Sequence, residues 1–268
     1  MAAASEGRVR IEDHGPVRVV TFDRPDRANA FDAALYRAAA AALGSAEVDD
    51  EVGVVVLTGA GRSFTAGTDL AEMAATAEGS GAADGAVSDG GAPAGHPFDV
   101  FLDAVLAFGK PLIAAVNGAG VGLGLTLLAH CDLVLVSEGA RLRAPFTQMG
   151  VVPEAASSYL LPERMGFQRA AEALLTSDWI SAVDAVACGL ALRVYPADEL
   201  LPAAIALGAK IAAHPAASVR ATKALITAAR RDAVADARRR EGAAFGEILR
   251  SPAIGAAIRG HLEESKGA

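Results

Sequence analysis

The chain has 268 residues, of which 52% are hydrophobic and 21% are charged, a balance typical of a folded protein with a large buried core. A net charge of -8 and an aromatic content of 5% argue against nucleic acid and anionic membrane as partners. Two distant cysteines, Cys131 and Cys188, predict buried free thiols, and the sequence has neither a signal core nor an apolar run long enough to span a bilayer. We therefore expect a cytoplasmic protein.

The first elements in chain order predict an α/β fold. Residues 9–25 hold two β-rich runs divided by a His-Gly-Pro turn, which predicts a hairpin. An alanine-rich segment follows and predicts a helix that ends at Gly44. Three short apolar runs then predict strands buried on both faces: "VGVVVLTGAG", "PLIAAVNGAG" and "CDLVLVSEGA". Helical patterns alternate with these runs, which is typical of α/β proteins.

Two further stretches are defined by composition. Residues 76–97 are almost wholly Gly, Ala, Ser, Asp and Pro, which predicts a flexible loop. From Leu200 the pattern is helical to the end, with arginines at Arg230 and Arg238–Arg240. We expect these arginines on a solvated or subunit-facing helix surface, with anion binding as the alternative.

The glycine-rich stretch "NGAGVGLGL" at residues 117–125 follows a predicted strand. Its spacing does not fit a dinucleotide-binding loop, because Leu123 stands where the third glycine is needed, and no Gly-Lys-Ser/Thr of a phosphate loop follows. What remains is a strand, a tight turn and a helix that begins near Gly122, with small residues that let a ligand approach the backbone.

The stretch "GRSFTAGTDL" at residues 61–70 forms a second junction of this kind, and a helical pattern follows it. Each junction presents free backbone N–H groups at the positive end of a helix. For either junction taken alone, the simpler interpretation is a tight turn with no functional role. Two such donors that converge on one point make an oxyanion hole.

Taken together, several ordered motifs resemble the crotonase, or enoyl-CoA hydratase/isomerase, family. They are "FDRPDRANAFD", "VVVLTGAGRSFTAGTDL", "KPLIAAVNGAGVGLGLTLLAHCDLVLVSEGARL", "APFTQMGVVPEAASSYLLPERMG" and "LLTSDWISAVDAVACGLALRVYP". The resemblance implies an α/β spiral of repeated ββα units over residues 1–199, and a helical region over 200–268 that builds homotrimers or hexamers. It implies an acyl-CoA thioester as substrate and no metal or redox cofactor, coenzyme A being part of the substrate.

The resemblance also implies the site. The N–H groups of Ala66 and Leu123 would hold the thioester oxygen, with Gly122 beside Leu123. The substrate groove would be bordered by Arg24, Arg27 and Ala28, and by Ala66, Gly67, Thr68, Asp69 and Leu70. Apart from this role, Asp69 is expected to start a helix and Asp132 to be a structural acid.

Hydratases of this family use two glutamates, one for water and one for the proton at C2. Here those positions hold Thr126 and Phe146, and neither side chain can act as a carboxylate base. Both would line the groove, and hydratase activity is not expected.

The remaining carboxylate lies in "GVVPEAASSY", where Glu154 follows a proline. One interpretation is a first-turn helix residue stabilised by the macrodipole. The other follows from a resemblance to delta-3,delta-2-enoyl-CoA isomerases of the peroxisomal type, in which this acid would carry a proton from C2 of a 3-enoyl-CoA to C4. Apolar neighbours would raise its pKa toward a useful value.

Other functions stay open at this point. They include hydration with a displaced base, thioester hydrolysis, dehalogenation, and acyl-CoA binding without turnover. A serine hydrolase is disfavoured because the chain lacks G-x-S-x-G. The histidines have no metal-ligand spacing beyond "HCD" at residues 130–132, which we interpret as core packing at a helix end.

Overall fold

A computed structural model describes residues 9–69 and 95–249 of the chain. Most of the predicted loop at 76–97, and the helical pattern expected after Asp69, lie outside the described residues. Within the described ranges no single helix is long and apolar enough to cross a membrane. Helices α8 (Leu200–Ala212) and α9 (Ala216–Ala228) reach that length and hydropathy only as a pair bent by 105°.

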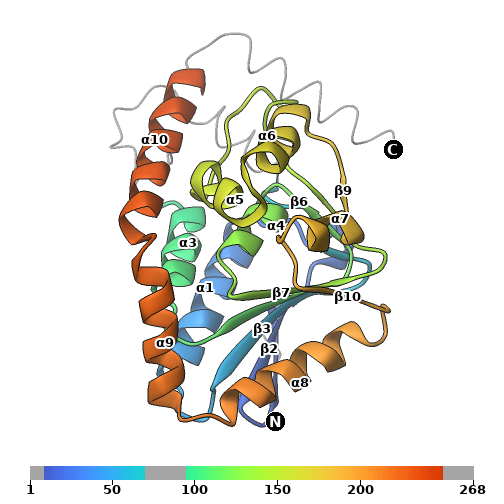
Figure 1. Cartoon of the computed structure of the whole chain (residues 1–268), viewed down its shortest axis with the longest axis vertical. Coiled ribbons are helices and arrows are strands. Elements are labelled where there is room, and N and C mark those ends of the chain that lie inside the picture. The colour runs from blue at the N-terminus through green and yellow to red at the C-terminus, as the bar shows by residue number, and fades with distance from the viewer. Residues whose placement is uncertain (1–8, 70–94, 250–268) are drawn as a thin grey trace.

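Two sheets form the centre of the described chain (Figure 1). The larger has the order β1-β2-β3-β5-β7-β10, with β1 (Val9–His14), β2 (Val17–Phe22), β3 (Val54–Gly59), β5 (Leu112–Val116), β7 (Leu133–Ser137) and β10 (Arg193–Tyr195). The smaller has the order β4-β6-β8-β9, with β4 (Ser63–Thr65), β6 (Ala119–Val121), β8 (Arg141–Arg143) and β9 (Ile180–Ser181). The predicted hairpin is confirmed, because β1 and β2 pair antiparallel.

The sheets are built by a repeat along the chain. A long strand enters the large sheet, a short strand then enters the small sheet, and a helix follows. The pairs β3–β4, β5–β6 and β7–β8 stack in this way, parallel to one another in both sheets. Because β3, β5 and β7 are almost wholly buried, they read as continuous apolar runs, and all three strand predictions are confirmed.

Helices cover the sheets and fill the connections. They are η1 (Pro25–Arg27), α1 (Ala33–Val48), α3 (Pro97–Ala107), α4 (Leu123–Thr126), η2 (Leu127–Ala129), α5 (Ser157–Met165), α6 (Phe167–Thr176), α7 (Ala182–Ala187), α8, α9 and α10 (Arg231–Leu249). The expected end of the first long helix was wrong, since α1 continues through Gly44 to Val48. A glycine inside a helix costs about 1 kcal/mol relative to alanine, and Leu43 and Ala46, both buried, carry the helix past it.

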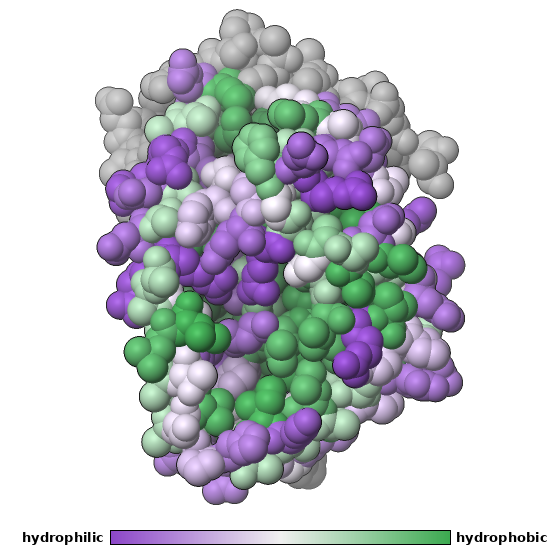
Figure 2. All heavy atoms as spheres, viewed as in Figure 1, coloured by the Kyte–Doolittle hydropathy of each residue, from purple (hydrophilic) through white to green (hydrophobic). Residues whose placement is uncertain are grey.

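The core has two parts, one on each face of the large sheet. Helix α8 covers one face, where Leu200 and Ala204 pack against alternate residues of β2, β3 and β5. The larger cluster lies on the other face, beneath α1, α3 and α4. Figure 1 shows α8 on the opposite side of the sheet from α1 and α3, and Figure 2 shows apolar side chains gathered over α8.

Helices α9 and α10 continue the helical region that the sequence predicts after Leu200. The expectation that its arginines lie on a solvated surface was wrong for Arg238, whose largely buried guanidinium pairs with Asp99 at 3.4 Å and Asp103 at 2.7 Å on α3. The division at residue 199 and the oligomerisation role of 200–268 stay predictions. Both cysteines are free, Cys131 buried and Cys188 partly buried.

Candidate active site

The first glycine junction follows β4 and runs alongside residues 28–31. Ala66 N–H donates to Ala28 O at 2.9 Å, and Asp69 N–H donates to Phe31 O at 2.8 Å. Gly67 N–H donates to Thr65 Oγ1 at 3.0 Å. Among the described residues nothing accepts a hydrogen bond from Thr68 N–H. The expectation that Ala66 is the free donor was therefore wrong, because strand-like pairing occupies its N–H group and leaves that of Thr68.

The second junction lies directly against the first. A Cβ built on Gly67, whose φ is +83°, would stand 2.5 Å from Val121 O and 3.2 Å from Leu123 N, so only glycine fits there. Leu123 is the first residue of α4, and within the described chain its N–H group has no acceptor, as is usual in the first turn of a helix. Thr68 and Leu123 thus offer two adjacent free donors.

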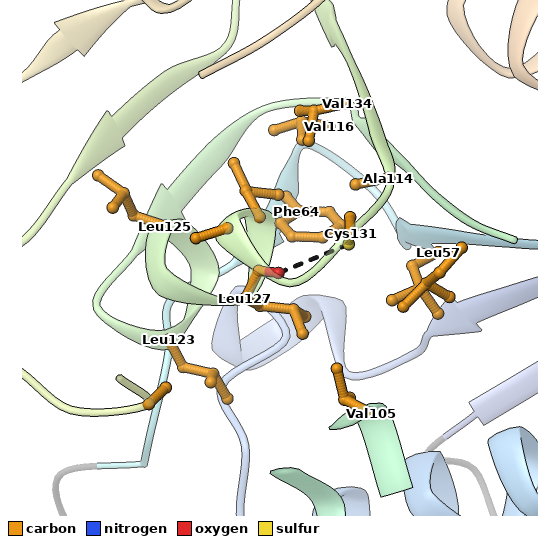
Figure 3. Close-up of a cluster of buried hydrophobic side chains, with 14 of the residues drawn as sticks. Leu57, Phe64, Val105, Ala114, Val116, Leu123, Leu125, Leu127, Cys131 and Val134 are labelled. Carbon is orange, nitrogen blue, oxygen red and sulfur yellow. Dashed lines mark hydrogen bonds between the residues drawn. The ribbon is translucent and has the colours of Figure 1, made fainter. Parts of the chain in front are cut away.

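A buried apolar cluster fixes the position of α4. Leu123, Leu125 and Leu127 are each at most 2% exposed. Figure 3 shows this turn of helix set among Phe64, Val116 and Val134, with Cys131 Sγ close to Leu127 O. A short helix held on several sides keeps its N-terminal donors in a fixed direction, which is what an oxyanion site needs.

The carboxyl group of Glu154 lies next to α4. Thr126 Oγ1 donates a hydrogen bond of 2.5 Å to Glu154 Oε1. Thr126 is three residues after Leu123, so the carboxyl lies about one helical turn from the free N–H group of that residue. Glu154 Oε2 is buried and has no hydrogen-bond partner in the described structure. This atom is therefore available to exchange a proton with a bound molecule.

Burial governs the acidity of Glu154. It raises the pKa of this carboxyl to about 8, the Thr126 hydrogen bond acts in the opposite direction, and the charges of Glu241 and Asp99 add to the rise. A carboxyl with a pKa near neutrality can both take up and release a proton at physiological pH.

A strained turn follows Glu154 and leads into α5. Ala155 and Ala156 both have φ of +57°, a conformation that alanine seldom adopts. Glu241 of α10 accepts hydrogen bonds from Ala156 N–H at 2.7 Å and Ser158 N–H at 2.8 Å. His130 Nε2 lies 2.7 Å from Ala155 O, and burial lowers the pKa of this histidine to about 4, so it is the neutral tautomer that donates. The turn is thus held on both sides.

The two positions at which the resemblance predicts the acids of a hydratase carry no carboxyl group here. Thr126 is fully buried, and Phe146 packs in the large core cluster. The other acids that face Glu154 are already engaged, since Glu241 binds two backbone N–H groups and Asp99 pairs with Arg238. Each described acid that faces Glu154 thus already has partners of its own.

A surface pocket of about 430 Å³ opens beside the first junction and carries three arginines. Its lining residues are Arg24, Arg27, Asp32, Ala33, Ala34, Arg37 and Asp69. Arg24 also donates to Asp69 at 2.6 Å and to Ala30 O at 3.0 Å, so it braces the junction as well as lining the pocket. Guanidinium groups suit phosphate oxygens, which makes this pocket a candidate for the charged end of a large ligand.

The remaining predicted residues are placed as follows. Ala28 is in the left-handed region with φ of +49° and accepts the bond from Ala66, and Gly122 caps α4 with φ of +55°. Leu70 lies outside the described residues. Asp132 is a structural acid as expected, because it accepts from Leu112 N–H at 2.7 Å and pairs with Lys223 at 2.8 Å. In the two described ranges, no cluster of acidic, histidine or cysteine side chains could hold a metal ion.

Sequence reasoning did not find Glu241, Arg37 or the contact of His130 with the turn. Glu241 is 85 residues from Ala156 along the chain and follows an arginine run that looks like helix surface. Arg37 lies within a predicted helix and had no motif around it. Thr68 was expected only to line the groove. The hydrogen bonds of residues 66–69 identify it as a donor, because the N–H groups of the other three residues already have acceptors.

Comparison with known proteins identifies the family of the chain. The family described as Enoyl-CoA hydratase/isomerase matches residues 12–267. The chain is 37% identical over 195 residues to Enoyl-CoA delta isomerase 2 of Rattus norvegicus, an alignment that covers 73% of this chain and 48% of that protein. It is also 34% identical over 207 residues to 2,3-dehydroadipyl-CoA hydratase of Escherichia coli, covering 77% and 76% of the two chains. The chain thus spans about half the length of the isomerase relative.

The fold is that of solved relatives. The crystal structure of an enoyl-CoA hydratase/isomerase from Pseudoalteromonas atlantica superposes with a TM-score of 0.85 at 34% identity, covering 96% of this chain and 97% of that one. The predicted α/β spiral of ββα units is confirmed by this similarity and by the two stacked sheets.

Proposed function

The chain belongs to the enoyl-CoA hydratase/isomerase family, and on that premise we propose that it moves the double bond of a 3-enoyl-CoA to the 2-position, with Glu154 as the only proton shuttle. The observation that carries this proposal is the buried Glu154 carboxyl, with a partnerless Oε2, one helical turn from a free backbone donor. The isomerase relative supports the same choice.

The reaction needs one base and one oxyanion site. Glu154 takes a proton from C2, and the electron pair of the broken C–H bond forms a dienolate whose negative charge is on the thioester oxygen. The N–H groups of Thr68 and Leu123 bind that oxygen. The protonated Glu154 then gives the same proton to C4, and the electrons return to form the C2–C3 double bond. The proton balance is zero, so no water is consumed.

The acidity of Glu154 suits both steps. A carboxyl with a pKa of about 8 is a stronger base toward C2 than an ordinary glutamate, and it still releases the proton at C4. Thr126 steadies the carboxyl through Oε1 and leaves Oε2 for the substrate. A threonine at this position therefore orients the base where a hydratase would hold a second acid.

In this proposal the arginine pocket binds the nucleotide part of coenzyme A. Arg27 and Arg37 are the pocket arginines for which the described residues offer no ion pair, and the pocket opens next to the junction that carries Thr68. A thioester whose phosphates lie against these arginines would extend along residues 66–69 toward Glu154. This placement is part of the proposal.

The test compares two reactions in parallel. The protein is mixed with 3-hexenoyl-CoA to follow the conjugated 2-enoyl thioester, and with crotonyl-CoA to follow hydration. We expect isomerisation without brisk hydration. Glu154→Gln should lower kcat for isomerisation by about 10²–10⁴-fold, the usual contribution of a positioned acid–base group. Glu172→Gln, an exposed glutamate on α6, is the matched control and should keep the parent rate.

Hydration is the second candidate, because the chain also resembles a hydratase at 34% identity. Brisk hydration of crotonyl-CoA with no isomerisation would reject the proposed reaction in favour of this one. Binding of CoA esters with turnover in neither assay would instead identify a binding protein. An unchanged isomerisation rate in Glu154→Gln would remove Glu154 as the base.

A further inference from the structure

We propose that Glu241 of α10 is a positioning residue for Glu154: it clamps the strained turn that places the Glu154 carboxyl against α4. The inference rests on the function proposed above, in which Glu154 is the base. Glu241 touches backbone groups of the turn and has no role as a base of its own.

The clamp consists of two charge-assisted hydrogen bonds. Oε2 of Glu241 accepts from Ala156 N–H at 2.7 Å, and Oε1 accepts from Ser158 N–H at 2.8 Å. These N–H groups belong to the N-terminus of α5, where a negative charge is favourable. Glu241 is 7% exposed, so solvent does little to weaken these bonds. Helix α10 is thus tied to the turn that directly follows Glu154.

The turn needs such a clamp because it is strained. Ala155 and Ala156 both have φ of +57°, and alanine pays about 1–2 kcal/mol for each such conformation. Strained turns persist when their surroundings hold them from several sides. Here His130 holds Ala155 O and Glu241 holds Ala156 N–H. Without Glu241 the turn can relax, and the Glu154 carboxyl would leave its place beside Thr126.

Glu241 also acts through its charge. The groups that face Glu154 are Thr126 from α4, Asp99 from α3 and Glu241 from α10, and Arg238 offsets part of the charge of Asp99. The negative charge of Glu241 raises the pKa of Glu154, so its removal should lower that pKa. A residue with a merely structural role, distant from Glu154, would leave this titration unchanged.

The first test is Glu241→Gln, whose amide carries no charge and turns one of the two acceptor oxygens into an NH₂ donor that faces a backbone N–H group. We expect kcat for isomerisation to fall at least about 10-fold with little change in KM, because the base is displaced and the groove is kept. The titration of Glu154, followed by infrared spectroscopy of its carboxyl and assigned by difference from Glu154→Gln, should shift to lower pH. Glu247→Gln, on an exposed site of the same helix, should change neither quantity.

The second test asks whether strain in the turn at Ala156 causes the loss of kcat in Glu241→Gln. Glycine adopts the conformation of Ala156 without strain, so Ala156→Gly combined with Glu241→Gln should recover a large part of kcat. This double variant also serves if Glu241→Gln alone does not fold. A double variant with no gain in kcat, or a Glu241→Gln variant that keeps the parent's kcat and Glu154 titration, would overturn the inference. If the parent itself does not isomerise 3-hexenoyl-CoA, the proposed reaction fails, and the Glu154 titration still decides whether Glu241 controls this carboxyl.

Discussion

At the scale of single residues, the proposed reaction depends most on Glu154. It is a carboxyl that burial has moved out of the acidic range, held by one threonine and faced by two other acids. Groups with such shifted pKa values cluster at functional sites, because the desolvation that shifts them is costly to maintain. Two measurable properties follow, one kinetic and one thermodynamic.

The kinetic property is a pH profile. The base must be ionised to take the C2 proton, so kcat/KM for isomerisation should rise with pH and level off above about 8. Thr126→Val removes the hydrogen bond that lowers the pKa of Glu154, and the rise should then move to higher pH. Steady-state rates between pH 5 and 10 measure both curves. A flat profile for the parent would contradict the assignment of the base.

The thermodynamic property is a pH-dependent stability. The folded state keeps its proton on Glu154 up to about pH 8, whereas the unfolded chain loses it near 4.5. The folded state therefore binds more protons in this window, and the free energy of unfolding falls as pH rises through it. Glu154→Gln removes this loss, so at pH 8 it should be more stable than the parent by up to about 4 kcal/mol. Urea unfolding at pH 8 measures the gain, and at pH 4 the difference should nearly vanish.

At the scale of elements, the contact between the two glycine junctions is decisive. Gly67→Ala would place a Cβ 2.5 Å from Val121 O at a positive φ, and should cost about 3 kcal/mol or more as well as displacing Thr68 N–H. Gly44→Ala is the matched control, because Gly44 lies in α1 with nothing within 4 Å, and should stabilise the chain by about 1 kcal/mol. Denaturant unfolding and isomerase turnover of both variants test this pair. Equal stability of the two would contradict the close packing of the junctions.

The elements also show what sequence could and could not predict. Strands β3, β5 and β7 were predictable because burial on both faces leaves continuous apolar runs. The two junctions were predictable as glycine turns, but the free donor was not: Ala66 and Thr68 differ only in which N–H pairs with residues 28–31. The role of Glu241 could not be predicted from the sequence, because its partners lie 83 and 85 residues away and no local pattern encodes these contacts.

At the scale of the whole molecule, several large apolar side chains are exposed on the described surface. Phe167, Leu175 and Val183 on α6 and α7 are each at least 70% exposed. We propose that they contribute to the interface of a homotrimer or hexamer together with the helical region over 200–268, where Leu225 and Ile226 of α9 are also exposed. Phe167→Asp with Leu175→Asp should lower the mass measured by light scattering, whereas Val48→Asp, equally exposed on α1, should not. A monomeric parent would reject this assembly.

The clamp proposed for Glu241 sets when, during synthesis, the turn after Glu154 can become fixed. The acid proposed as the base is at position 154, but the bonds that fix its turn form only once α10 has been made, 83 to 85 residues further along the chain. The last described strand, β10, ends at Tyr195, so a nascent chain contains every described strand of both sheets before the residues of the clamp are made. If the proposed clamp is correct, a copy of the chain that stops before α10 would contain every described strand of both sheets and still not isomerise a thioester.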